Sequence, residues 1–166
     1  MRSASRDSLV RLIEGEFGSV TAGDGIHFRE AKLIDRHHQP FADRRLAREL
    51  DPELHWQDVP DSVISESYSV LSFVDEAGFL FCLPAVLRFV LVRDGEGCGQ
   101  VANHCLMSLV PGGTRTIDRV VRSMSPGQRQ AVASFLQYVV SAGDEEFLMA
   151  SSAHEALASG VFGNAS

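Results

Sequence analysis

The sequence lacks the features of a nucleic-acid-binding, membrane-spanning or exported protein. Its net charge is -7, and neither lysine nor arginine occurs between Arg48 and Arg88, whereas phosphate binding needs a concentrated basic surface. The longest nearly apolar run, residues 79–92, has 14 residues and contains Pro84, whereas a membrane-spanning helix needs about 20 apolar residues. Charged residues interrupt the N-terminus, where a secretory signal needs an unbroken apolar segment. We therefore expect a cytoplasmic protein with no nucleic-acid or membrane partner.

Catalytic and cofactor-binding motifs are also lacking. The three cysteines include no CxxC pair, and this odd number favours a reducing compartment over a disulfide framework. Residues 94–99, DGEGCG, lack the GK[ST] ending of a phosphate-binding loop. Neither the GxSxG motif of serine hydrolases nor the HExxH motif of zinc proteases occurs. We predict no cofactor, and we favour a protein that is not an enzyme.

Length and composition predict a single domain over residues 1–166, ordered from about residue 5 to residue 158 and frayed after that. Hydrophobic residues make up 45% of the chain and charged residues 22%, a balance typical of globular domains. A chain of this length buries roughly two-thirds of its unfolded surface, so its core needs no metal or disulfide. No internal repeat or long linker divides the sequence.

The most apolar stretch, residues 71–92, predicts a β-hairpin followed by a helix. Two short apolar runs flank Asp75-Glu76-Ala77-Gly78, whose residue types are typical of a turn. Pro84 would end the second strand and open a helix that continues to Val92, because proline suits the first turn of a helix. We therefore predict an α+β fold: a mostly helical single domain with a small antiparallel sheet, built on a central hairpin at 71–83 and covered by helices.

Apolar residues at helical spacing predict further helices along the chain. The clearest begins at Ser125-Pro126-Gly127-Gln128, a capping box with proline at the first helical position, and has an apolar stripe from Val132 to Val140. Residues 26–35 remain ambiguous between extended chain and a helical turn. The other predicted helices cover residues 5–17, 41–50, 100–109, 117–124 and 147–157.

Two segments resemble a family of small bacterial proteins known as domain-of-unknown-function family 6714. They are LSFVDEAGFLFCLPAVLRFVL and RVVRSMSPGQRQAVASFLQYV, and WQDVP lies where that family has its tryptophan. The resemblance covers roughly residues 5–141. The sequence departs from the pattern expected of the family in the DGEGCG loop and in an alanine-rich extension beyond Ser141. The family has no established activity, so the resemblance implies a fold and no function. Its most specific pieces are Gly78-Phe79, Leu83-Pro84-Ala85, and Ser125-Pro126 with Gln128.

Charge is segregated along the chain. Eight acidic residues lie between Glu49 and Glu76, whereas residues 97–143 carry four arginines, Arg115, Arg119, Arg122 and Arg129, against a single acid. One interpretation is that the two segments are solvated faces or pair with each other after folding. The other is that the acidic segment forms a docking surface for a basic partner. The residues predicted to bind that partner are Glu49, Asp51, Glu53, Trp56, Asp58, Asp61 and Glu66.

Trp56 has two interpretations of its own. An isolated tryptophan beside acidic residues is either an anchor in the core or an exposed contact for a ligand. The core is favoured, because burying so large a ring contributes on the order of a few kcal/mol.

The preferred hypothesis is a non-enzymatic cytoplasmic protein-binding module, similar to an immunity or adaptor protein, that uses this acidic face. The alternative is a small metal-dependent hydrolase. Its metal ligands would come from the cluster of histidine and aspartate side chains between residues 27 and 38, which also has Glu30 nearby. Adjacent histidines in a loop, however, ordinarily point apart into solvent. A Cys98–His104 nucleophile pair and a self-associating structural protein are further alternatives, and the oligomeric state stays open. The weak metal-ligand candidates are His27, Asp35, His37 and His38.

Overall fold

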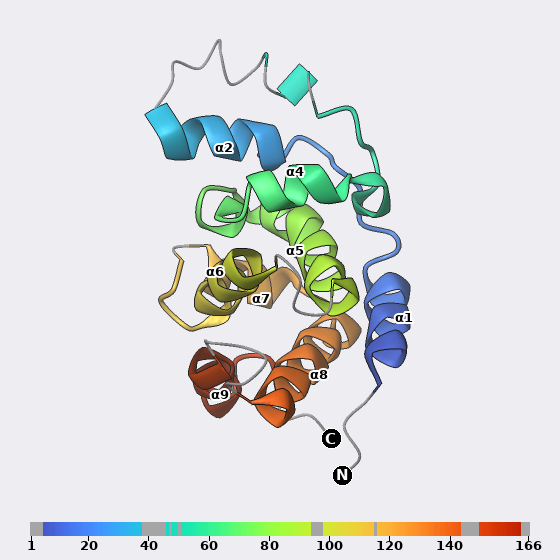
Figure 1. Cartoon of the computed structure of the whole chain (residues 1–166), viewed down its shortest axis with the longest axis vertical. Helices are drawn as coiled ribbons and strands as arrows, with labels where there is room; N and C mark the ends of the chain where they lie inside the picture. The colour runs from blue at the N-terminus through green and yellow to red at the C-terminus, as the bar shows by residue number, and fades with distance from the viewer. Residues whose placement is uncertain are drawn as a thin grey trace.

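Helices form all of the regular structure in the part of the chain that is described. The computed structural model describes residues 5–37, 46, 48–49, 51–93, 98–114, 116–143 and 150–163, with residues 36 and 37 by their backbone alone. Within these ranges the only β-type pairing is one isolated antiparallel bridge between Thr21 and His55. The predicted α+β class is therefore wrong, and the fold is all-α (Figure 1). No helix within these ranges combines the length and the apolar composition needed to cross a bilayer.

The order of the elements along the chain is simple. Eight α-helices and two short 3-10 helices, η1 and η2, follow one another within the described ranges. Their bounds are α1 Arg6–Glu16, α2 Phe28–His37, η1 Trp56–Asp58, α4 Asp61–Glu66, η2 Val70–Ser72, α5 Glu76–Val92, α6 Gly99–Leu109, α7 Ile117–Ser123, α8 Pro126–Ala142 and α9 Ala150–Ala158.

The stretch predicted as a hairpin begins instead with η2 and continues as the central helix α5. Asp75 is the N-cap of α5, and its Oδ1 accepts a hydrogen bond from the backbone N–H of Gly78 at 2.8 Å. The Asp-Glu-Ala-Gly sequence is therefore a helix start, with an acid in the first turn, and not a β-turn. Pro84 lies inside the helix and is buried. It gives no N–H to the carbonyl of Leu80, so packing has to hold that turn together.

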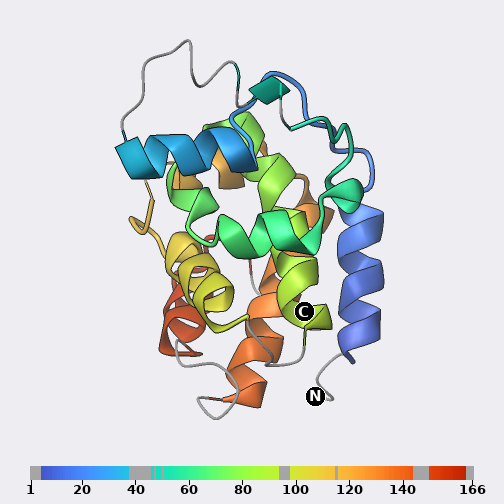
Figure 2. The same ribbon diagram turned by 45° about the horizontal axis from the view of Figure 1, so that its top comes forward.

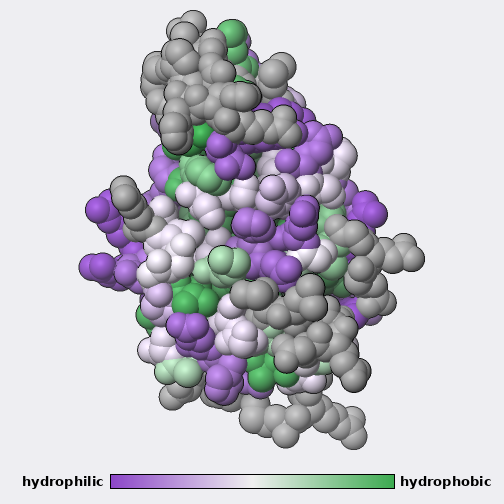
Figure 3. Space-filling model, turned by 60° about the vertical axis from the view of Figure 1, so that its left-hand side comes forward, coloured by the Kyte–Doolittle hydropathy of each residue, from purple (hydrophilic) through white to green (hydrophobic). Residues whose placement is uncertain are grey.

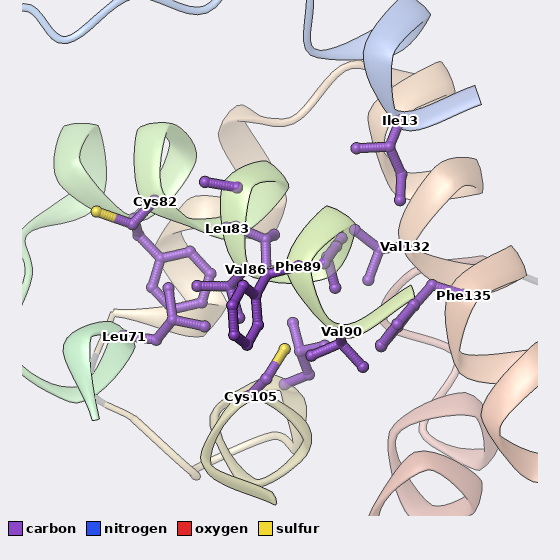
Figure 4. Packing of buried hydrophobic residues seen from close by; sticks show 14 of the residues in the cluster. Ile13, Leu71, Cys82, Leu83, Val86, Phe89, Val90, Cys105, Val132 and Phe135 are labelled. Atoms are coloured by element: carbon purple, nitrogen blue, oxygen red, sulfur yellow. The ribbon is translucent and has the colours of Figure 1, made fainter. Parts of the chain in front are cut away.

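Helix α5 is the centre of the hydrophobic core. Helix α1 lies along one side of it and α6 along the other, while α2 and α4 cross its upper end and α8, which packs on α1, lies toward its lower end (Figure 1). In Figure 4, side chains from α1, η2, α6 and α8 converge on those of α5. A helix that is apolar on every side needs such a surround, because any exposed side would lose the free energy of burial. The residues that meet there include Ile13, Leu71, Val86, Phe89, Val90, Cys105, Val132 and Phe135.

The amphipathic helices outside this stretch follow the predictions closely. Ser5 caps α1, and Ser125 and Gln128 form the predicted capping box of α8, with bonds of 3.1 and 3.0 Å. Helices α6 and α7 occupy the predicted ranges, and the ambiguous residues 26–35 mostly belong to α2. Of the predicted helix 41–50, Leu46, Arg48 and Glu49 are helical and the other positions lie outside the described residues.

The C-terminal part of the chain packs further than expected. The predicted helix 147–157 corresponds to α9, while residues 144–149 lie outside the described ranges. After α9, Phe162 returns to the core with only 3% of its surface exposed. The tail that we expected to fray from Ser159 is therefore packed as far as Phe162.

Candidate functional site

The residues predicted to bind a partner divide into buried and exposed groups. Trp56 is fully buried, and its indole Nε1 donates to the carbonyl oxygen of Phe17 at 2.9 Å. The guanidinium of Arg88 lies over the ring, 5.2 Å from its centroid, and donates to the carbonyl oxygen of Gln57 at 3.0 Å. Trp56 is therefore a core anchor, as favoured, and does not belong to an exposed face.

Asp51 and Glu53 lie against the first turn of α2. The side chain of Asp51 is 4% exposed and accepts from the backbone N–H of Arg29 at 3.0 Å and from its guanidinium at 2.7 Å. Glu53 accepts from the same guanidinium at 3.3 Å. Burial raises the pKa of Asp51, and the hydrogen bonds from Arg29 work in the opposite direction. These two acids attach the segment that precedes η1 to helix α2, so they are not available to a partner.

A second ion pair strengthens the same contact. Arg48 donates to the nearly buried carboxylate of Glu30 at 3.1 Å. The backbone N–H of Ala22 donates to the carbonyl oxygen of Leu54 at 3.0 Å. This hydrogen bond holds the residues after Glu53 against the segment before α2. Burial without an opposite charge would cost several kcal/mol for each carboxylate, so the pairing explains why acids are tolerated there.

The exposed predicted acids gather on one surface, which we call the α4 face and define as Asp58, Asp61, Ser62, Ser65 and Glu66. Helix α4 crosses in front of α5 in Figure 2, with Ile64 turned into the core. The carboxylate of Asp61 accepts two hydrogen bonds from Arg93, at 2.8 and 3.1 Å, and Glu66 accepts one from Lys32 at 2.7 Å. Asp58 is exposed and has no ion-pair partner among the described residues. Glu49 is also exposed, but residues 47 and 50 beside it lie outside the description.

The acidic and basic segments scarcely pair with each other. Within the described residues a single ion pair joins them, between Glu76 and Arg119 at 3.5 Å. Arg122 and Arg129 donate instead to backbone carbonyl oxygens of their own region. Arg115 lies outside the described residues. Four of the eight acids, Asp51, Glu53, Asp61 and Glu66, pair instead with Arg29, Arg93 and Lys32. Mutual pairing of the two segments is therefore wrong for most of the described charges.

A small pocket opens at the C-terminal end of α4. Its volume is about 140 Å³. The hydroxyl of Ser69 donates to the carboxylate of Asp35 at 2.9 Å, and the ring of Tyr68 leans on His104 with 4.9 Å between ring centroids. The pocket is lined by Ala31, Lys32, Asp35, Glu66, Ser67, Tyr68, Ser69 and Val70.

The predicted metal ligands do not converge in the part of the chain that is described. His27, expected in a solvent-exposed loop, is buried: its Nε2 lies 2.7 Å from the carbonyl oxygen of Ala22, and its ring stacks on Phe81 at 4.6 Å. Asp35 is eight residues further on, about 12 Å away along the axis of α2. The side chain of His37 and all of His38 lie outside the description. The described residues contain no group of three or more side chains that could hold a metal ion.

The cysteines behave as small apolar residues. Burial raises the pKa of Cys105 to about 12 and that of Cys82 well above its ordinary value, so neither thiol ionises readily. Cys98 precedes α6 and is also buried. His104 lies six residues later, about 9 Å along the helix axis, and leans on Tyr68. The Cys98–His104 pairing therefore lacks the geometry of a nucleophile and its base.

The family model of a family of unknown function, DUF6714, matches residues 5–159. The chain belongs to this family. The match extends beyond residue 141, so the C-terminal extension expected to depart from DUF6714 lies largely within it. No curated protein and no solved structure matches the chain.

One motif of the DUF6714 resemblance has a clear structural reason. A Cβ atom on Gly78 would lie 2.0 Å from the carbonyl oxygen of Ile26, and one on Gly25 would lie 2.4 Å from the nitrogen of Gly78. Asp75 also accepts from the backbone N–H of Ile26 at 3.0 Å. The chain before α2 therefore lies directly on the first turn of α5, and only glycine allows that approach.

Sequence reasoning missed the cations that organise the site. Arg29 and Lys32 lie one turn apart on α2 and bind acids from two separate segments of the chain. Their spacing of three residues was a sign of a shared helix face. The partners were not visible in the same way, because they lie more than twenty residues away in sequence. Tyr68 gave no signal, because it is an isolated aromatic residue in a short turn.

Proposed function

We propose that the chain is a non-enzymatic protein-binding module that engages a basic partner through the α4 face. The proposal includes the setting expected from the sequence, the cytoplasm of a bacterium, where free cysteines remain reduced. The observation that carries it is the surplus of acids on one short surface element whose opposite face is fixed in the core. An immunity or adaptor protein that masks a basic partner would need such a surface.

The ion pairs on this surface can be replaced by ion pairs with a partner. The side chains of Asp61 and Glu66 are 46% and 66% exposed, and those of their partners, Arg93 and Lys32, are 48% and 22% exposed. Exposed pairs of this kind contribute at most about 1 kcal/mol each. A lysine or arginine from a partner can therefore replace Arg93 or Lys32 at little cost, which is not true of the buried pairs at α2.

The partner's charge would act first on the rate of encounter. Complementary charges speed association and fix orientation more than they deepen affinity, and salt screens them within about 10 Å at 0.1 M ionic strength. Binding through the α4 face should therefore weaken steeply as the salt concentration rises.

Affinity capture tests the proposal. The immobilised chain is exposed to a lysate of the organism that encodes it, in low and then in high salt, and basic proteins should be retained and then released. The triple variant Asp58→Asn, Asp61→Asn, Glu66→Gln should lose the retained protein.

The matched control changes the same number of charges elsewhere. Asp7, Glu14 and Asp118 are exposed acids outside the α4 face. The triple variant Asp7→Asn, Glu14→Gln, Asp118→Asn should retain the partner. Equal loss in both triple variants would show attraction by net charge alone and would contradict the proposal, as would retention of no basic protein.

A further inference from the structure

We propose that the pocket at the end of α4 receives an arginine side chain of the basic partner, with Asp35 as its counter-ion and the ring of Tyr68 as one wall. This inference rests on the proposed function and states which group of the partner enters the pocket beside the α4 face. It follows from the size, the charge and the lining of the pocket.

The pocket has the size of one side chain. A cavity of about 150 Å³ is large enough to hold a benzene molecule, so about 140 Å³ accommodates a guanidinium with one or two methylene groups. Binding sites for whole small molecules are usually about 300 Å³ or more. The pocket therefore favours a group presented by a larger partner.

The charges in the pocket leave one carboxylate without a cation. Lys32 binds Glu66 at 2.7 Å, whereas Asp35 accepts only from the neutral hydroxyl of Ser69. Among the described side chains no cation pairs with Asp35, although this carboxylate lines the pocket. A cationic group from outside can bind Asp35 without displacing Lys32.

The lining selects guanidinium over ammonium. Tyr68 is 37% exposed, and the contact of its ring with His104 restrains its orientation beside the pocket. A planar guanidinium can stack on such a ring and offer two N–H groups to a carboxylate at the same time, whereas a compact ammonium group does neither as well.

On this side of the molecule, apolar groups are small and scattered. The elements on the left of Figure 1, including α2 and α6, come forward in Figure 3, where green groups stand singly among purple ones. This pattern is poor for a large hydrophobic interface. It favours an anchor that combines one charged contact with one aromatic contact.

The test uses the ¹⁵N-labelled full chain and two isosteric probes. N-acetyl-arginine amide carries the guanidinium, and N-acetyl-citrulline amide has the same shape without the charge. The arginine probe should shift the backbone signals of Lys32, Asp35 and Ser69 to saturation, and the citrulline probe should not. Equal shifts with both probes, or shifts spread over acids throughout the surface, would overturn the inference.

Variants separate the two proposed contacts. Asp35→Asn should weaken binding of the arginine probe about two- to fivefold, the range of an exposed ion pair. Tyr68→Leu should weaken it, while Tyr68→Phe, which keeps the ring, should not. The matched control is Asp118→Asn, an exposed acid outside both the α4 face and the pocket, which should bind the probe as the native chain does. Unchanged affinity in Asp35→Asn would overturn the inference.

The two proposals can fail separately. If the protein partner is retained equally by the native chain and by Asp35→Asn, the α4 face stands and the arginine assignment fails. If the arginine probe binds at Asp35 but no basic protein is retained, the protein-binding function fails and the pocket remains a guanidinium site.

Discussion

At the scale of single residues, Gly78 has the least freedom to change. Its missing side chain lets the carbonyl of Ile26 approach the first turn of α5, and that atom belongs to the backbone and cannot rotate away. Gly78→Ala should therefore destabilise the protein by about 1–3 kcal/mol, the cost of overpacking. The measurement is the free energy of unfolding in urea.

Gly15 supplies the matched control for this substitution. It lies inside α1, and a Cβ atom there would meet nothing within 4 Å. Gly15→Ala should raise the free energy of unfolding by about 0.5–1 kcal/mol, because alanine loses less conformational freedom in a helix. Equal effects of the two substitutions would show that the contact between Gly78 and Ile26 is not close.

Asp51 should make the free energy of unfolding fall as the pH rises, which is the opposite of what most paired carboxylates do. Burial raises its pKa in the folded protein above the ordinary value of 3.8, so the folded state holds this proton to higher pH than the unfolded chain does. The contribution of Asp51 to stability is then largest below 3.8 and is lost as the pH rises through the folded value. Most paired carboxylates act in the opposite direction.

Comparing the native chain with a variant that lacks the carboxyl group isolates the contribution of Asp51. The free energy of unfolding is measured against pH for the native chain and for Asp51→Asn, which keeps the shape and cannot titrate. The native value minus the variant value should fall as the pH rises over the interval just above 3.8. A difference that grows with pH would mean that the hydrogen bonds from Arg29 outweigh burial.

At the scale of elements, the amphipathic helices could be predicted and the central one could not. The helices α1, α6 and α8 carry both a cap or break and a one-sided apolar stripe, and two independent signals located them. Helix α5 is buried all round, so it has no polar face to reveal a period of 3.6 residues. Its interior Pro84 and its Asp-to-Gly start are also typical of a strand end and a turn.

The length of the apolar run was the signal that favoured a helix there. Strands usually have about 4–8 residues, whereas a run of 14 needs a helix or a turn in its middle. Proline is tolerated at Pro84 because neighbouring helices hold the turn around it, and a local pattern contains no information about those neighbours. Tertiary packing therefore outweighed local propensity at this element.

The candidate site shows the same division between local and distant information. Exposure of Asp58, Asp61 and Glu66 could be predicted from an acidic segment, because charged groups seldom leave water. Burial of Asp51 and Glu53 could not, because it depends on Arg29, more than twenty residues earlier. The pocket at Asp35 likewise joins α2 to the turn after α4, and only the folded chain brings these together.

At the scale of the whole molecule, one connected core implies one cooperative unfolding transition. Side chains from every described helix belong to one hydrophobic cluster around α5, and the short segments η1 and α4 contribute Trp56 and Ile64 to it. Trp56 is the single tryptophan of the chain, so its fluorescence reports on the region between α1 and α4, whereas circular dichroism reports on all the helices. The two signals should change at the same denaturant concentration.

A core substitution far from Trp56 in sequence sharpens this prediction. Leu87 of α5 is fully buried, and Leu87→Ala should lower the free energy of unfolding by about 2–5 kcal/mol. Both signals should shift together by the same amount, because the region around Trp56 has no core of its own and its stability depends on α5. A fluorescence transition that stays in place while the circular dichroism transition shifts would show that residues 17–59 fold as a separate unit. The α4 face would then rest on a support independent of the central helix.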